Sequence, residues 1–132
     1  DVGNVLFLGI NTWNNTELIS RAGQFVEGAV FVDGFFADCK NPTCRQFIED
    51  FRNVFGSEPG TVQALSYDVA RIISHVLKKN PKTRLAFRDL IQEVQNFPGV
   101  SGDITYEPSS GRFSRKLALL TVKNGKIVEV AF

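Results

Sequence analysis

Hydrophobic and polar residues follow a helical period in the middle of the chain. Between Thr61 and Lys79, apolar residues recur at three- and four-residue spacing, which places them on one face of a helix about five turns long. The residues on this predicted buried face are Val62, Leu65, Val69, Ile72, Ile73 and Val76. The opposite, polar face carries Asp68, Arg71, His75 and Lys78. We expect a core helix whose polar face points to solvent, with a weak surface ion pair between Asp68 and Arg71.

Two further amphipathic helices are predicted, one on each side of this element. Asn41 followed by Pro42 is a favourable helix start, and the helix is expected to end at Gly56. Its apolar stripe consists of Phe47, Ile48, Phe51, Val54 and Phe55. Thr83 is the predicted N-cap of the later helix. The stripe of that helix consists of Leu85, Leu90, Ile91 and Val94.

The first third of the chain predicts a strand, a loop, a short helix and a second strand. Residues 5–10 are a short, continuous apolar run, which is typical of a strand covered on both faces, and residues 28–34 are interpreted as a second buried strand. Residues 11–15 form the loop after the first strand. Thr16 is the predicted N-cap of the short helix, and Gly23 is its predicted stop.

The last third of the chain changes from helices to strands. Residues 96–102 contain Pro and Gly and interrupt the last helix. We expect a short strand at residues 104–106 and a polar turn region at residues 107–114.

A β-hairpin is predicted to close the chain. Asn124-Gly125 lies between the runs 117–122 and 127–132, and this pair favours a tight turn in which both residues adopt positive φ. The complete order is strand, helix, strand, three helices and then strands. One sheet does not easily explain three successive helices, so the order favours two separate α/β bodies.

Composition excludes several classes of function. The 132 residues fit one domain at most, and 43% apolar residues with 12 Phe supply a sizeable core. The 15 basic and 14 acidic residues are scattered and leave a net charge of +1, which argues against nucleic-acid binding. No apolar run approaches the roughly 20 residues that a membrane span needs.

The sequence contains no constellation typical of an enzyme. His75 lacks a nearby Ser or Cys nucleophile, and no glycine-rich phosphate-binding motif occurs. The acidic residues on polar helix faces are interpreted as solvating charges; they are Glu49, Asp50, Asp89 and Glu93. We therefore expect no catalytic activity, no cofactor and no metal.

Cys39 and Cys44 are the two cysteines of the chain. A disulfide between them, which would imply an oxidising compartment, and two free thiols are open alternatives. A metal site is disfavoured because no second pair of Cys or His ligands completes a tetrahedral set.

The loop at residues 11–15 is the strongest candidate for a binding site. It follows a predicted parallel strand and precedes a helix, which is where open α/β sheets bind their ligands. Trp13, the only Trp of the chain, lies there among three Asn side chains. A pocket and an ordinary polar turn with Trp13 folded onto the core are both compatible with this composition.

Several segments of the chain have a specific order and spacing. They are Val26–Val30, the series Phe47, Phe51, Phe55-Gly56 and Pro59, then Ser66–Ala70, Phe97–Gly102, Ile104–Tyr106 and Asn124-Gly125. Together they resemble the C-terminal part of the type I periplasmic binding proteins, the bilobed receptors of the leucine/isoleucine/valine-binding kind. The resemblance covers nearly all of the 132 residues.

The resemblance implies an α/β fold with two Rossmann-like lobes, present here as a C-terminal fragment of the receptor with a terminal β-hairpin. Residues 1–34 and 103–132 would belong to the second lobe. Residues 35–102 would supply helices of the first lobe and the crossings between the lobes. Because the chain starts at Asp1 and contains no Met, we expect it to be part of a longer protein, whose signal peptide would lie upstream.

The function implied by the resemblance is binding without chemistry. Such a receptor holds a small polar molecule, such as an amino acid, between its lobes and delivers it to the permease of an ABC-type importer. The location implied is the bacterial periplasm, or the cell envelope for a lipoprotein. The positions of this sequence that match the ligand cleft are Asn11, Thr12, Trp13, Asn14, Phe35 and Tyr67.

One departure from the family changes the expected ligand. Amino-acid receptors of this kind tend to carry an acidic group in the loop after the first strand, whereas this chain has Asn14 and Asn15, with Glu17 already in the helix. An aromatic acid or a neutral solute stacked on Trp13 is therefore an equal candidate. The alternative function is a lipoprotein of the same fold that binds and activates another envelope protein. The isolated fragment is also expected to self-associate through its apolar helix faces.

Overall fold

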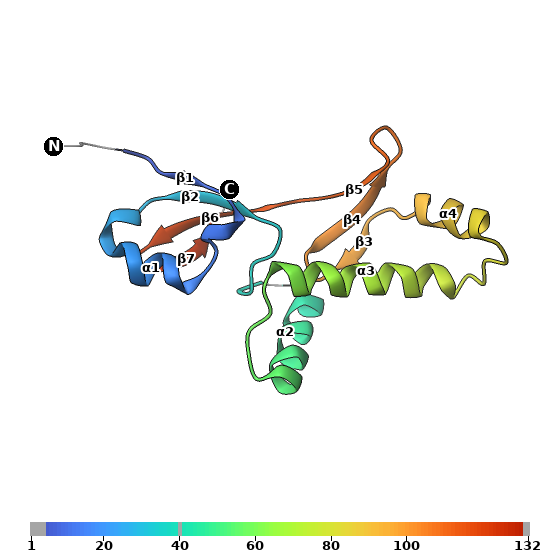
Figure 1. Ribbon diagram of the computed structural model, residues 1–132, viewed down its shortest axis with the longest axis horizontal. Helices are drawn as coiled ribbons and strands as arrows, with labels where there is room; N and C mark the ends of the chain where they lie inside the picture. The colour runs from blue at the N-terminus through green and yellow to red at the C-terminus, as the bar shows by residue number, and fades with distance from the viewer. Residues whose placement is uncertain (1–4, 40, 131–132) are drawn as a thin grey trace.

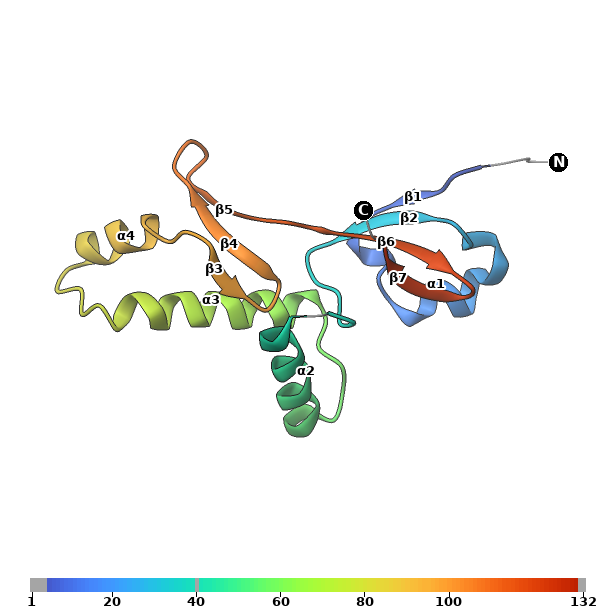
Figure 2. The same cartoon turned by 180° about the vertical axis from the view of Figure 1, so that it is seen from behind.

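The computed structural model describes residues 5–39 and 41–130. Figure 1 shows two bodies joined by two connections, a bent loop from β2 to α2 and a straight stretch from β5 to β6, and Figure 2 shows the same arrangement from behind. One body holds a four-stranded sheet with α1, and the other holds a three-stranded sheet with α2, α3 and α4. No strand is shared between the two sheets among the residues described.

The sheet of the first body is built from segments at both ends of the chain. Its strand order is β1-β2-β6-β7. β1 and β2 pair in parallel, whereas β2 with β6 and β6 with β7 pair antiparallel. The strands are β1 (Leu8–Gly9), β2 (Val30–Asp33), β6 (Ala118–Lys123) and β7 (Lys126–Glu129).

The core of the first body lies where α1 (Thr16–Ala22) packs against this sheet. Two short 3-10 helices, η1 (Asn11–Trp13) and η2 (Gly23–Val26), flank α1. The buried residues of this core are Val26, Ala29, Phe31, Leu120 and Val122, and Leu18, Ile19 and Ala22 of α1 pack against them.

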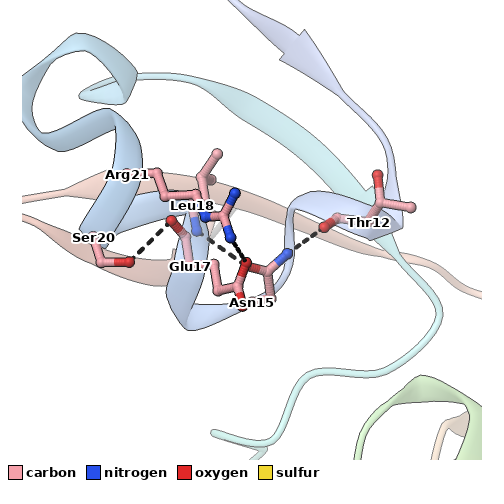
Figure 3. A network of polar contacts seen from close by, with 6 residues as sticks. All are labelled: Thr12, Asn15, Glu17, Leu18, Ser20 and Arg21. Atoms are coloured by element: carbon pink, nitrogen blue, oxygen red, sulfur yellow. Dashed lines mark hydrogen bonds and ion pairs between the residues drawn. The ribbon is translucent and has the colours of Figure 1, made fainter.

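The start of α1 differs from the prediction by one residue. Asn15 is the N-cap, and its side-chain oxygen accepts a hydrogen bond of 3.0 Å from the backbone N–H of Leu18 (Figure 3). The Asn15 amide also donates to the carbonyl oxygen of Thr12, so this side chain joins the loop to the helix. Assigning the cap to Thr16 was therefore wrong, because Asn is at least as good a cap as Thr and precedes it.

The terminal hairpin has the predicted turn. β6 and β7 are joined by Asn124 (φ 53°) and Gly125 (φ 66°), which both adopt the left-handed conformation that this turn requires. The Glu27 carboxylate accepts hydrogen bonds from both turn N–H groups. Residues 131 and 132, the end of the predicted last strand, lie outside the described residues.

The second body contains the three consecutive helices that the sequence predicts. Asn41 caps α2 by accepting a 2.9 Å hydrogen bond from the N–H of Thr43, and Gly56 (φ 67°) ends this helix. The elements of this body are α2 (Pro42–Phe55), α3 (Thr61–Leu77), α4 (Arg84–Gln92), β3 (Phe97–Gly99), β4 (Gly102–Glu107) and β5 (Arg112–Arg115).

Residues 97–115 differ from the prediction. β4 pairs antiparallel with both β3 and β5, and none of these strands pairs with the first sheet. The expectation that the chain returns to the second-lobe sheet at residue 103 was wrong for residues 103–115, which belong to the body of the three helices. The segment interpreted as a helix breaker, residues 96–102, contains β3, and the region interpreted as a polar turn, residues 107–114, contains most of β5. Pairing between strands is non-local, so local composition did not reveal it.

The buried row of α3 also differs from the prediction. The buried residues of α3 are Ala64, Asp68, Ile72 and Val76. Ile72 and Val76 pack with Val94 and Ile104, which lie in the segment after α4 and in β4. Val62, Val69 and Ile73 are 73%, 56% and 39% exposed, although they were predicted to be buried.

The second body therefore presents an apolar surface to solvent. Val62, Val69, Ile73 and Leu77 recur at helical spacing on α3, and all are exposed. Val54 and Phe55 at the end of α2 are 73% and 65% exposed. A surface of this kind usually marks a place where another chain segment or partner packs. Within the residues described, no helix is both long and apolar enough to cross a membrane.

Candidate functional site

The candidate site lies where the parallel strands β1 and β2 end. Gly9 of β1 pairs with Phe31 of β2, so the two strands reach the same edge of the sheet. η1 and the loop to α1 follow β1, and the crossing to the second body follows β2 at Asp33. The carboxyl ends of parallel strands are the usual ligand position of open α/β sheets.

Trp13 anchors the loop after β1 to the sheet. Its ring is half-buried and lies 6.2 Å from the ring of Phe31, measured between centroids. A Cβ atom at Gly9 would collide with the Trp13 ring, so only a glycine there lets the indole lie this close to the strand. Trp13 thus forms part of the first body's core. Its stacking on a solute stays a prediction.

Asn14 faces the junction of the two bodies. Its side-chain amide donates to the Asp33 carboxylate at 2.7 Å and to the carbonyl oxygen of Phe35 at 3.1 Å. Of the predicted loop residues, Asn11 and Thr12 are exposed, and their side chains make no hydrogen bond within the described part of the chain. Asn14 therefore shapes the site, while Asn11 and Thr12 remain free to contact a solute.

Asp33 and Thr61 lie at the candidate site and were missed in the sequence. Asp33 is only 2% exposed, and its carboxylate accepts hydrogen bonds from Asn14, from the Thr61 hydroxyl at 2.7 Å and from the N–H of Gly34. Thr61 is the first residue of α3, in the second body. Asp33 could have been noticed because it is an acidic residue at the end of an apolar run. Acidic side chains are rarely buried unless they are hydrogen-bonded, so a buried one at this position predicts hydrogen-bond partners from other parts of the chain.

Phe35 and Tyr67, two other predicted site residues, lie on the second-body side of the junction. Phe35 is 4% exposed and packs edge-on against Phe47, with 6.1 Å between ring centroids. Tyr67 is 42% exposed, lies 4.7 Å from the Phe47 ring and has the Arg71 guanidinium 5.9 Å from its ring centre. Within the predicted set, Asn14 is hydrogen-bonded to Phe35 through its side-chain amide and to Asn11, whose carbonyl oxygen accepts a 3.0 Å hydrogen bond from the Asn14 N–H.

The polar side of α3 holds a buried carboxylate where a surface ion pair was expected. Asp68 is 1% exposed and accepts hydrogen bonds from the N–H of Val100 (2.7 Å), the N–H of Ser101 (2.9 Å) and the Ser101 hydroxyl (2.6 Å). Arg71 instead donates to the carbonyl oxygen of Pro98 at 2.7 Å. The predicted Asp68–Arg71 pair was therefore wrong, because the turn after β3 uses the carboxylate as its acceptor.

A concavity of about 260 Å³ lies beside the two crossings. Phe35, Cys39 and Val100 line one part of it, and Lys116 and Leu117 of the second crossing line another. Cys39 and Cys44 form a disulfide, with 6.3 Å between their Cα atoms, which ties the first crossing to the first turn of α2. The exposed loop residues of the candidate site do not line this concavity, so we treat it as separate. No cluster of three metal-ligating side chains occurs in the described segments.

The sequence matches the profile of a known family over most of its length. The match is to "Periplasmic binding protein" and spans residues 2–126. The chain belongs to this family. Its α/β elements in two bodies have the type I fold, as expected from the resemblance. None of the curated proteins matches the chain.

Solved structures of this family superpose on the chain. A protein assigned to branched-chain amino acid ABC transport in Rhodospirillum rubrum gives a TM-score of 0.87 at 23% identity, covering 97% of this chain and 38% of its own. Leucine binding protein LivK of Thermotoga maritima gives 0.73 at 26% identity, covering 94% and 36%. A Rhodopseudomonas palustris solute-binding protein in complex with benzoate gives 0.74 at 16% identity, covering 96% and 35%. The chain thus spans little more than a third of these relatives' length.

Proposed function

We propose that this chain is part of a solute-binding receptor of an ABC-type importer, which holds a small polar molecule between two lobes without catalysing a reaction. One lobe would include β1, β2, β6, β7 and α1, and the other would include the helices and strands of residues 41–115. Family membership and the two-body arrangement support this proposal. The observation that carries it is that Asp33 accepts hydrogen bonds both from Asn14, in the loop after β1, and from Thr61, at the start of α3, which supports a binding loop at the junction.

Two ligand classes follow from the relatives. Structural relatives include a protein in complex with Leu from Desulfitobacterium hafniense and the benzoate complex described above. Because the loop of this chain presents Asn11 and Thr12 and no carboxylate, we favour an organic acid with an apolar or aromatic body. Amide and hydroxyl groups donate hydrogen bonds to a ligand carboxylate, whereas an ammonium group prefers an acidic acceptor.

The receptor would act outside the cytoplasm, as the family name implies, and would deliver its solute to a membrane permease. We propose the periplasm or the bacterial cell envelope as its location, the latter if the complete protein is a lipoprotein. The disulfide between Cys39 and Cys44 supports an oxidising compartment. The surface of α3 and α2 that is exposed here would be covered by first-lobe elements outside this chain.

One observation favours a second candidate function, a protein-binding regulator of the same fold. The Asn14 amide donates its hydrogen bonds to Asp33 and Phe35, and the Trp13 ring packs on Phe31 of the sheet. Fewer side chains of the loop can therefore contact a solute than its composition implies. Thermal unfolding of the full-length receptor with leucine, isoleucine, benzoate and 3,4-dihydroxybenzoate separates the two functions. A solute at 100 times its Kd adds about 2.7 kcal/mol to the free energy of unfolding. The absence of any shift across the panel favours the protein-binding regulator.

A further inference from the structure

Asp33 lies at the point where the chain leaves the first body. It is the last residue of β2 and pairs in register with Ala118, the first residue of β6. The first crossing starts directly after it at Gly34. The second crossing, residues 116 and 117, ends directly before Ala118. Both connections between the bodies therefore leave the sheet at the Asp33–Ala118 pair.

The hydrogen bonds of Asp33 reach three separate parts of the molecule. Asn14 approaches from the loop after β1, Thr61 from the first turn of α3, and the Gly34 N–H from the crossing itself. Asp33 and Thr61 are 28 positions apart in the chain. No ion pair to Asp33 is found within the described ranges, so these neutral donors stabilise its buried charge.

A carboxylate is a favourable hydrogen-bond acceptor at position 33. Hydrogen bonds to a charged oxygen are stronger than those between neutral groups, and negative charge is favourable at the N-terminus of a helix such as α3. An Asn at position 33 would present an NH₂ group to at least one of the present donors. The geometry therefore depends on the charge of Asp33 and on its two oxygens.

Arg115, the last residue of β5 before the second crossing, lies at the same place. A Cβ atom at Gly34 would lie 2.5 Å from the guanidinium of Arg115, so the Arg115 side chain lies directly against the backbone of the first crossing. The end of β5 in the second body is thus in contact with the first crossing beside the Asp33 cluster. A change in the angle between the bodies would move Thr61, in the second body, relative to Asp33, in the first.

We propose that Asp33 is a positioning residue that sets the angle between the two bodies in the ligand-free receptor, through its hydrogen bond to Thr61. Asn14 shares the same carboxylate, so the candidate binding loop is positioned relative to α3 by the same group. The inference rests on the proposed function in one respect: the angle matters because a solute is to be held between the bodies. Lobe closure is a two-state change that such a contact biases toward one state.

The test is a distance measurement between the bodies in the full-length receptor without ligand. Nitroxide labels are attached at Ser20→Cys in α1 and Asp50→Cys in α2, both at exposed positions. The native cysteines form a disulfide and do not react with the label. Pulsed electron–electron double resonance then gives the distribution of distances between the labels for wild type, Thr61→Val and Thr61→Ser.

Thr61→Val removes the hydroxyl and keeps the shape of the side chain, whereas Thr61→Ser keeps the hydroxyl. We expect the ratio of the minor to the major distance population to change on the order of tenfold in Thr61→Val and to stay at the wild-type value in Thr61→Ser. Asp33→Asn should shift the distribution in the same direction. A Thr61→Val distribution that superimposes on the wild type would overturn the proposal. Since no ligand is present, this result does not depend on the outcome of the solute panel.

Discussion

The carboxylate of Asp68 lies 2.7 Å from the backbone nitrogen of Val100, a residue 32 positions later in the chain. The same carboxylate accepts two more hydrogen bonds from Ser101, so α3 and the turn between β3 and β4 are joined by one buried acidic group. The two N–H donors of this turn have no strand partner at that point and obtain their acceptor from the helix. The three-stranded sheet is thereby fixed to α3 independently of apolar packing.

We predict that Asp68→Asn destabilises the protein by about 3 kcal/mol, because an NH₂ group replaces one acceptor oxygen and leaves buried donors without a partner. The free energy of unfolding in urea measures this loss. Glu49→Gln, at an exposed position of α2, is the matched control and should change stability by less than about 0.5 kcal/mol. Equal stability of the two variants would contradict the role of Asp68.

Gly99 provides a second test of the same turn. A Cβ atom at this position would lie 2.7 Å from the carbonyl oxygen of Gly102 and 2.8 Å from a carboxylate oxygen of Asp68. We expect Gly99→Ala to cost roughly 1–3 kcal/mol of unfolding free energy, as overpacking does in a rigid site. Ser57→Ala, at an exposed position, is the control. A Gly99→Ala variant as stable as this control would show that the turn can relax.

The disulfide between Cys39 and Cys44 is expected to stabilise the start of α2. It closes a short loop, with a sequence separation of 5, for which chain entropy predicts a contribution of about 2 kcal/mol. Dithiothreitol should therefore lower the urea midpoint of the wild type. The double variant Cys39→Ala with Cys44→Ala should have the lower midpoint already and should not respond to the reductant. A wild type that is equally insensitive would contradict the prediction.

The exposed apolar row of α3 predicts how residues 1–132 behave when produced alone. We expect self-association, because Val69 and Ile73 would lack the elements that cover them in a complete lobe. Val69→Lys with Ile73→Lys should shift the molar mass measured by light scattering toward the monomer. Ser20→Lys with Gln24→Lys adds the same charge to exposed positions of the first body and should leave the association unchanged. A monomeric wild-type fragment would contradict the prediction.

The helices and the hairpin were predictable because their signals are local. Asn41-Pro42, Gly56 and Thr83 mark helix ends where the structure has them, and Asn124-Gly125 adopts the predicted turn. Each of these signals depends on the conformational preference of one or two residues, which the surrounding fold does not change.

The errors concern contacts between distant segments. The sequence places Asp68 on a polar face, but β3 and β4 pack on that side of α3 and use the carboxylate as an acceptor. Asp33 was overlooked because its partners, Asn14 and Thr61, are 19 and 28 positions away. The strands of residues 97–115 were assigned to the wrong sheet because register and partner are set by tertiary packing.

The central claim is that a small solute binds at the junction, against the loop after β1. Isothermal titration of the full-length receptor with leucine, isoleucine, benzoate and 3,4-dihydroxybenzoate tests it most directly, with Asn11→Ala as the site variant and Gln24→Ala as the control. Both positions are exposed in the first body. We predict saturable binding of at least one solute, with a Kd raised about tenfold or more by Asn11→Ala and unchanged by Gln24→Ala. No binding of any solute, or binding that Asn11→Ala leaves unaltered, would contradict the claim.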